Sequence, residues 1–217
     1  MKKSLLPLVE AQPDRADFPE GRGQAPSRIV LQSLLSRQSQ WPLSSPPPTD
    51  EQLSLILDAA LRAPDHGRLR PWRFVIVRGA ARDALGQVLV DIARAREPDE
   101  PAETHAHRRQ RAHAAPLIIA LGAAVAGESH IPEVEQLLSV GAATMNMLNA
   151  IHALGYGGFW ATGVDAYDAG LHAALGFESS ERLLGFLFVG TPRSASRRVA
   201  RPERAAHVRE WTGPAMQ

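Results

Sequence analysis

The 217-residue sequence contains no cysteine. This absence excludes disulfides, thiolate nucleophiles, iron–sulfur clusters and cysteine-ligated zinc, so any redox chemistry must be carried by a bound cofactor. The sequence also lacks a surplus of one charge, because 24 Lys and Arg residues stand against 23 Asp and Glu residues, a formal net charge of +1. The overall charge therefore gives no reason to expect a nucleic-acid partner or binding to a membrane surface.

Several segments and motifs are missing as well. No apolar stretch approaches the length of a transmembrane helix. The run from Leu5 to Val9 is broken by Pro7 and is too short for an export signal, so we expect a cytoplasmic protein. There is no Gly-x-Gly-x-x-Gly after a strand and no phosphate-binding P-loop. A nicotinamide nucleotide would therefore have to bind without a Rossmann domain.

The remaining pattern is that of a globular protein, with 44% hydrophobic and 22% charged residues. Amphipathic helical stretches alternate with short apolar runs that are typical of buried strands. This alternation predicts a central sheet covered by helices on both faces, an αβα sandwich. We expect longer helices over 27–39, 49–63, 80–97 and 133–154, a short one over about 166–175, strands over 74–77, 117–121 and 183–189, and a strand or loop over 157–160.

The two ends of the chain differ in composition from its middle. Residues 1–26 contain repeated Pro and Gly without periodicity, which predicts a flexible N-terminal arm. We interpret residues 27–217 as a single domain whose last part, 192–217, is an extended Arg-rich tail. Because this tail has little apolar content to pack on its own chain, it could wrap around a partner.

The most informative segment runs from Arg62 to Phe74, where a helix ends, a polar loop turns and a strand begins. On composition alone, an ordinary loop explains it well. A ligand site is the alternative. Arg62, His66 and Arg70 are close in sequence and supply the cations that an anionic ligand requires.

This segment resembles the signature of FMN-dependent nitroreductases, and its Pro-Asp-His at 64–66 is similar to a subgroup of small bacterial NAD(P)H nitroreductases. Further segments resemble the same family in the same order. Each is weak alone, but their order and spacing together are specific. They are Leu34–Ser39, His130–Gly141, Gly155–Gly163 and Gly185–Pro192, and the resemblance covers about residues 28–192.

The resemblance implies an α+β fold of the nitroreductase type, an αβα sandwich with a mixed, mainly antiparallel central sheet. It also implies a homodimer with an exchanged C-terminal arm, FMN as cofactor and NAD(P)H as electron donor. Arg37 and Ser39 would hold the FMN phosphate, Arg62 and His66 would reach the flavin across the dimer interface, and glycines at 157 and 158 would let the backbone approach it. The implied FMN-binding residues are Arg37, Gln38, Ser39, Arg62, His66, Arg70, Trp160, Ala161 and Thr162.

Two of these residues depart from the family pattern. Gln38 stands where the family usually has a second Arg, so the phosphate grip is either weaker or supplemented by tail cations, for which Arg197, Arg198 and Arg201 are the candidates. Arg70 stands where Gln usually precedes Pro-Trp. If it reaches the flavin N1–O2 edge, it would stabilise the anionic reduced flavin and raise its potential; if it points to solvent, it does nothing.

The expected function is that of an FMN-dependent NAD(P)H oxidoreductase. It would reduce a small-molecule electron acceptor, such as a nitroaromatic or a quinone, by ping-pong hydride transfer. The flavin would carry the chemistry, so no general acid or base is expected, and no metal either. One alternative is a flavin-binding protein without turnover, a store or sensor. Another is a basic interaction protein acting through residues 105–113 and the tail arginines, although we interpret 105–113 as a solvated helix face.

Overall fold

The computed structural model describes residues 24–194 and 199–213. The chain falls into two compact units, one of Gln32–Ser196 and one of Met1–Leu31 with Arg197–Gln217. The described helices are α1 (Gln24–Ser36), α2 (Asp50–Ala60), α3 (Ala81–Arg96), α4 (Ala102–Ala112), α5 (Glu133–Ala153) and α6 (Ala169–Ala174), with 3-10 turns η1 (His66–Arg68), η2 (Val164–Tyr167) and η3 (Arg204–Ala206). The strands are β1 (Leu43–Ser44), β2 (Trp72–Arg78), β3 (Leu117–Ala124), β4 (Gly157–Ala161) and β5 (Glu181–Pro192).

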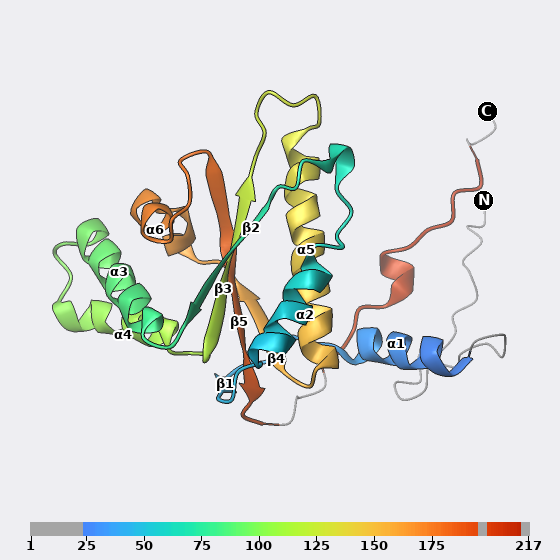
Figure 1. The fold of residues 1–217 in the computed structure, drawn as a ribbon, viewed down its shortest axis with the longest axis horizontal. Helices are drawn as coiled ribbons and strands as arrows, with labels where there is room; N and C mark the ends of the chain where they lie inside the picture. The colour runs from blue at the N-terminus through green and yellow to red at the C-terminus, as the bar shows by residue number, and fades with distance from the viewer. Residues whose placement is uncertain (1–23, 195–198, 214–217) are drawn as a thin grey trace. The chain divides into compact units, whose positions relative to one another are not determined.

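The five strands form one sheet in the order β1-β5-β3-β2, and β4 also pairs with β5 (Figure 1). Every pairing among the described strands is antiparallel. The expected α+β fold with a mainly antiparallel sheet is therefore confirmed. The parallel pairing that a mixed sheet would include does not occur among the described residues of this single chain.

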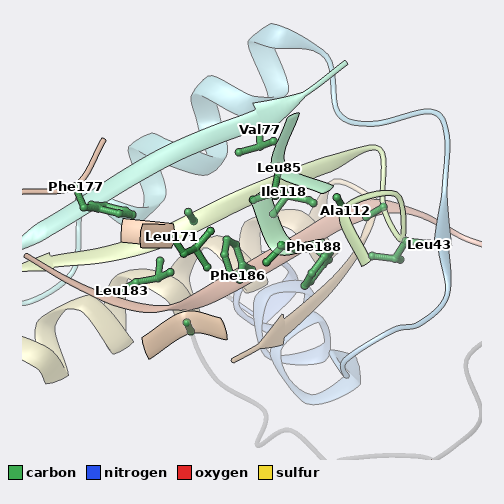
Figure 2. Packing of buried hydrophobic residues seen from close by; sticks show 14 residues of the cluster. Leu43, Val77, Leu85, Ala112, Ile118, Leu171, Phe177, Leu183, Phe186 and Phe188 are labelled. Atoms are coloured by element: carbon green, nitrogen blue, oxygen red, sulfur yellow. The ribbon is translucent and has the colours of Figure 1, made fainter. Parts of the chain in front are cut away.

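Both faces of the sheet are covered, because successive side chains of a strand point to opposite faces. On β3, Ile118 and Ala120 join a core cluster that includes residues of α3, α4 and α6 (Figure 2). The alternate residues Leu117, Ile119 and Leu121 join a second cluster with α2 and α5. All five are buried. The apolar run that predicted a strand covered on both sides is thus explained by packing on each face.

Local sequence sets several element boundaries. The Thr49 hydroxyl accepts a hydrogen bond from the Gln52 backbone N–H, and the Gln52 side chain accepts one from the Thr49 N–H. Together they form a capping box that begins α2. In α5, buried Ala143, Met147 and Ile151 belong to the second core cluster. Helix α5, expected over 133–154, thus forms part of the core on this face of the sheet.

The ends of the chain differ from expectation in detail. Helix α1 begins at Gln24, slightly before the expected start at Ser27, and residues 1–23 of the predicted arm lie outside the described residues. In the tail, Arg197 and Arg198 also lie outside them, whereas Arg201 is described and exposed. Within the described part of the chain, no helix is long and apolar enough to span a bilayer.

Candidate active site

The first group of expected site residues, Arg37 to Ser39, directly follows α1 and lies beside two other elements. The next residue, Gln40, donates a backbone hydrogen bond to the carbonyl of Gly158 in β4 at 3.2 Å. On the α5 side, Ser36 Oγ lies 2.9 Å from Nε2 of His152. This group is therefore held where the end of α5 and the start of β4 meet.

His152 adds a titratable group that the sequence did not single out. Burial lowers the pKa of His152 from its ordinary value, and the positive charge of Arg37 lowers it further. The imidazole therefore favours its neutral form beside Arg37. Sequence alone offered no signal for this pairing, because the two residues are joined only by the packing of the α1 end on α5.

The second group, Trp160 to Thr162, lies at the end of β4 and just beyond it. The Trp160 side chain is 39% exposed, and its Nε1 donates to the carbonyl of Leu184 at 3.3 Å. Packing within the chain explains the glycine at 158 near the start of this strand, because a Cβ there would lie 2.8 Å from Cδ2 of Leu148. Trp160 thus combines a fixed indole N–H with an accessible ring.

The third group lies in the loop after α2, where Arg62, His66 and Arg70 are all exposed. Asp65 organises this loop. Its Oδ1 accepts the backbone N–H of Leu69 at 3.2 Å and its Oδ2 accepts that of Arg70 at 2.8 Å. We expected Pro-Asp-His only as a family motif, and the structure gives its aspartate a physical role, since an Asp side chain readily caps N–H groups a few residues on.

The same loop contains an unusual run of left-handed backbone. Gly67 has φ 72°, Arg68 has φ 56° and Arg70 has φ 50°. Left-handed conformation costs an L-residue with a side chain roughly 1–2 kcal/mol. The carboxylate of Asp65 offsets this cost by satisfying two N–H groups, so the loop presents its cations in a defined conformation.

His66 is oriented by a partner from α5. Its Nδ1 lies 2.6 Å from Oε2 of Glu135, and both side chains remain partly exposed. The guanidinium of Arg70, in contrast, makes no hydrogen bond or ion pair with the rest of the described chain. Whether Arg70 reaches a flavin therefore stays an open prediction.

One chain does not bring all the expected residues together. His66 contacts Glu135 in the first turn of α5, whereas the segment at Arg37 contacts His152 in its last turn. At 1.5 Å per residue, these two contacts are roughly 25 Å apart along the helix axis. Figure 1 shows the η1 loop and the end of α1 at opposite ends of α5.

The fold presents cations at Arg37 and in the η1 loop and an accessible Trp160 ring at the end of β4, which suits a domain that binds an anionic cofactor with a flat ring. A family model described as "Nitroreductase family" matches residues 34–191, and the chain belongs to this family.

Similar proteins carry related names. The chain is 37% identical to "Putative NAD(P)H nitroreductase YdjA" of Escherichia coli (strain K12) over 164 residues, which cover 76% of this chain and 88% of that protein. It is 32% identical to "Putative NAD(P)H nitroreductase" of Haemophilus influenzae over 173 residues, covering 79% and 93%. Among solved structures, a "putative nitroreductase in complex with fmn" from Desulfovibrio desulfuricans superposes with TM-score 0.64 at 27% identity, covering 85% of this chain and 98% of that one.

Proposed function

We propose that this chain is an FMN-dependent NAD(P)H oxidoreductase that reduces small, electron-poor acceptors such as nitroaromatics and quinones. Family membership carries the reaction class, and similar proteins named for NAD(P)H and a relative solved with FMN support the two cofactors. A cytoplasmic location, where NAD(P)H is available, is part of the proposal.

The donor set fits FMN. Arg37 can offer a two-pronged guanidinium to the phosphate and Ser39 a hydroxyl, while Gln38 contributes a neutral amide. Trp160 and the following two residues, Ala161 and Thr162, flank the ring with an accessible indole face. When bound, FMN supplies the hydride-transfer chemistry, and the protein supplies binding, orientation and electrostatics.

The residues of the η1 loop complete the site from a second copy of the chain. Because the two cationic segments lie at opposite ends of α5, Arg62 and His66 act on the flavin held by the partner. Glu135 orients the His66 ring for this contact, and Arg70, like Arg68 an exposed cation of the loop, meets either the flavin ring or the solvent beside it. A homodimer with two shared sites follows.

An exposed apolar face supports this homodimer. On α5, Val134, Leu138 and Met145 are 61%, 65% and 39% exposed, and α2 adds exposed Leu55. Their spacing on α5 places them on one side of that helix, and contiguous exposed apolar surface marks an interaction site. A second copy would bury this face. We further propose that residues 27–217 act as one domain whose C-terminal tail reaches the partner.

The reaction class is tested on the purified protein. It should bind FMN, which gives a yellow protein with quenched flavin fluorescence, and NADH or NADPH should bleach the flavin band without oxygen. Re-oxidation by a panel of nitroaromatics and quinones then identifies acceptors. A protein that FMN cannot reconstitute refutes the proposal, and a flavin band that neither nicotinamide bleaches indicates a flavin store or sensor instead.

Site sharing is tested by mixing two variants. Heterodimers of Arg37→Ala and His66→Ala chains, isolated with two affinity tags, contain one site with both changes and one intact site. They should bind one FMN per dimer with the wild-type Kd, whereas each homodimeric variant binds weakly. If each chain builds its whole site alone, both sites of the heterodimer carry one lesion and no wild-type affinity is recovered.

A further inference from the structure

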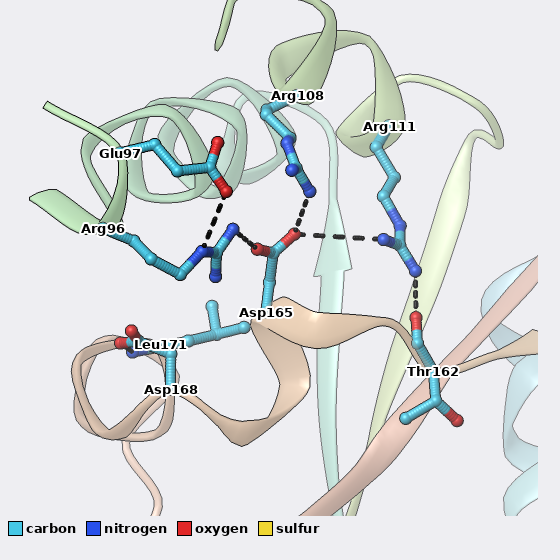
Figure 3. Close-up of polar contacts among 8 residues, drawn as sticks. All are labelled: Arg96, Glu97, Arg108, Arg111, Thr162, Asp165, Asp168 and Leu171. Carbon is cyan, nitrogen blue, oxygen red and sulfur yellow. Dashed lines mark hydrogen bonds and ion pairs between the residues drawn. The ribbon is translucent and has the colours of Figure 1, made fainter. Parts of the chain in front are cut away.

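A buried carboxylate, that of Asp165, follows closely in the chain after the segment that carries Trp160 and Thr162. Asp165, in η2, is only 2% exposed. It accepts hydrogen bonds from Nη2 of Arg96 at 3.0 Å and from Nη1 of Arg108 at 3.1 Å, and Nη1 of Arg111 lies 3.9 Å away (Figure 3). Three guanidinium groups from α3 and α4 thus converge on a single acid.

Arg111 differs from the other two arginines because it makes a second contact. Its Nη2 donates a hydrogen bond to the backbone carbonyl of Thr162, the residue that follows β4. One guanidinium therefore connects α4 both to Asp165 and to the main chain of the predicted flavin-flanking segment, as Figure 3 shows. A planar guanidinium can span two acceptors in this way, whereas a lysine ammonium acts as a point charge.

The glycines around this segment leave room for the arrangement. Gly163 has φ 120°, and a Cβ there would lie 2.6 Å from Nη1 of Arg111. On the other side, Gly185 has φ 121°, and its Cβ would lie 2.7 Å from the carbonyl oxygen of Ala161. The segment therefore lies between β5 and the Arg111 side chain. These contacts, more than the conformation of the loop, determine its position.

We propose that Arg111 is a positioning residue of the flavin site: it fixes the Thr162 carbonyl against α4 and thereby sets how Trp160 and Thr162 meet the flavin. This inference rests on the proposed function, because it needs FMN beside residues 160–162. Asp165 keeps Arg111 in place, and Arg96 and Arg108 share that acid without touching Thr162. The effect of Arg111 on the cofactor is therefore separable from the effect of the ion cluster on stability.

The test compares Arg111→Gln with the matched control Arg108→Gln. Both changes remove one cation from Asp165 on the same helix, but only the first removes the contact with Thr162. We expect both to lower Tm, and only Arg111→Gln to raise the Kd for FMN, by about tenfold, and to shift the absorption band of bound FMN. Arg111→Lys retains a charge for Asp165 without the two-acceptor geometry, and should have a Tm near that of the wild type and a weakened Kd.

The outcomes are distinct. If Arg111→Gln and Arg111→Lys bind FMN within twofold of the wild type and with its spectrum, the positioning role is refuted while the proposed function stands. Equal weakening by Arg108→Gln refutes it as well, because the cluster would then act only through stability. Should Arg111→Gln fail to fold, Arg111→Lys and Arg108→Gln decide the question. If the wild type itself binds no FMN, the proposed function fails and this inference fails with it.

Discussion

Replacing Asp65 by Ala tests whether this carboxylate holds the η1 loop in shape. Asp65 accepts the backbone N–H groups of Leu69 and Arg70. A hydrogen bond to a charged group contributes roughly 1.5–3 kcal/mol when well buried, but this loop is largely exposed, so we expect about 1 kcal/mol for each. Part of that loss is recovered, since Arg68 and Arg70 can leave their left-handed conformations once the loop is released.

The expected net cost of Asp65→Ala is therefore about 1 kcal/mol of unfolding free energy, or a decrease in Tm of roughly 2–4 °C for a protein of this size. Urea unfolding of the FMN-free protein measures the first quantity. Hydrogen exchange at the Leu69 and Arg70 amides should accelerate in the same variant, because both lose their acceptor. Asp58→Ala is the matched control: Asp58 is exposed on α2, and its side chain makes no hydrogen bond or ion pair in the described structure.

A double-mutant cycle makes the reasoning refutable. Arg70→Gly relieves the left-handed strain at φ 50° and should stabilise the wild type by about 0.5–1 kcal/mol. In the Asp65→Ala background the loop is no longer held, so the same change should give no gain. An equal gain in both backgrounds, or an Asp65→Ala variant as stable as Asp58→Ala, would show that Asp65 does not organise this loop.

Three further changes have clear expected results. Ile119→Ala, at a fully buried position of β3, should lower the unfolding free energy by about 2–5 kcal/mol in urea titrations. Gly158→Ala places a Cβ 2.8 Å from Leu148 and should cost about 1–3 kcal/mol in the same assay. The folded pKa of His152 lies below 6.5, so the unfolded chain binds the extra proton first and stability falls as pH drops through about 6.5. His152→Gln should remove this part of the pH dependence. If stability depends on pH in the variant as it does in the wild type, His152 is not the group responsible.

The parts of the fold with a strong local signal could be predicted from the sequence. The apolar runs of β2, β3 and β5 and the apolar second half of α5 are such signals, because burial on two faces leaves a continuous hydrophobic pattern. Strand β1 has only two residues, and its pairing with Thr191 and Pro192 joins segments that are far apart in the sequence. No local sequence pattern predicts such a strand.

The interpretation of 105–113 as a solvated helix face was wrong in part, for the same reason. His105 is 1% exposed, and its Nε2 lies 3.2 Å from the carbonyl of Glu97. Arg108 is turned toward Asp165, which is far away in sequence. A charge-rich helix whose buried partner is distant in sequence has the same local pattern as a solvent-exposed helix. The ion cluster therefore could not be recognised until the fold placed η2 beside α4.

Helix α5 separates, within one chain, site residues that the family resemblance grouped together. A sequence motif indicates which side chains bind one ligand. It does not indicate whether those side chains come from one chain or from two. The contacts of Glu135 and His152 show that a single α5 separates His66 from Arg37 by most of its length. A second copy whose α5 packs against the exposed apolar face at Leu138 could place one chain's loop near the other chain's α1 end. Under the proposed function, one homodimer both covers the apolar face and completes the flavin site. A substitution that breaks the dimer should therefore abolish FMN binding even though it touches no flavin-binding residue.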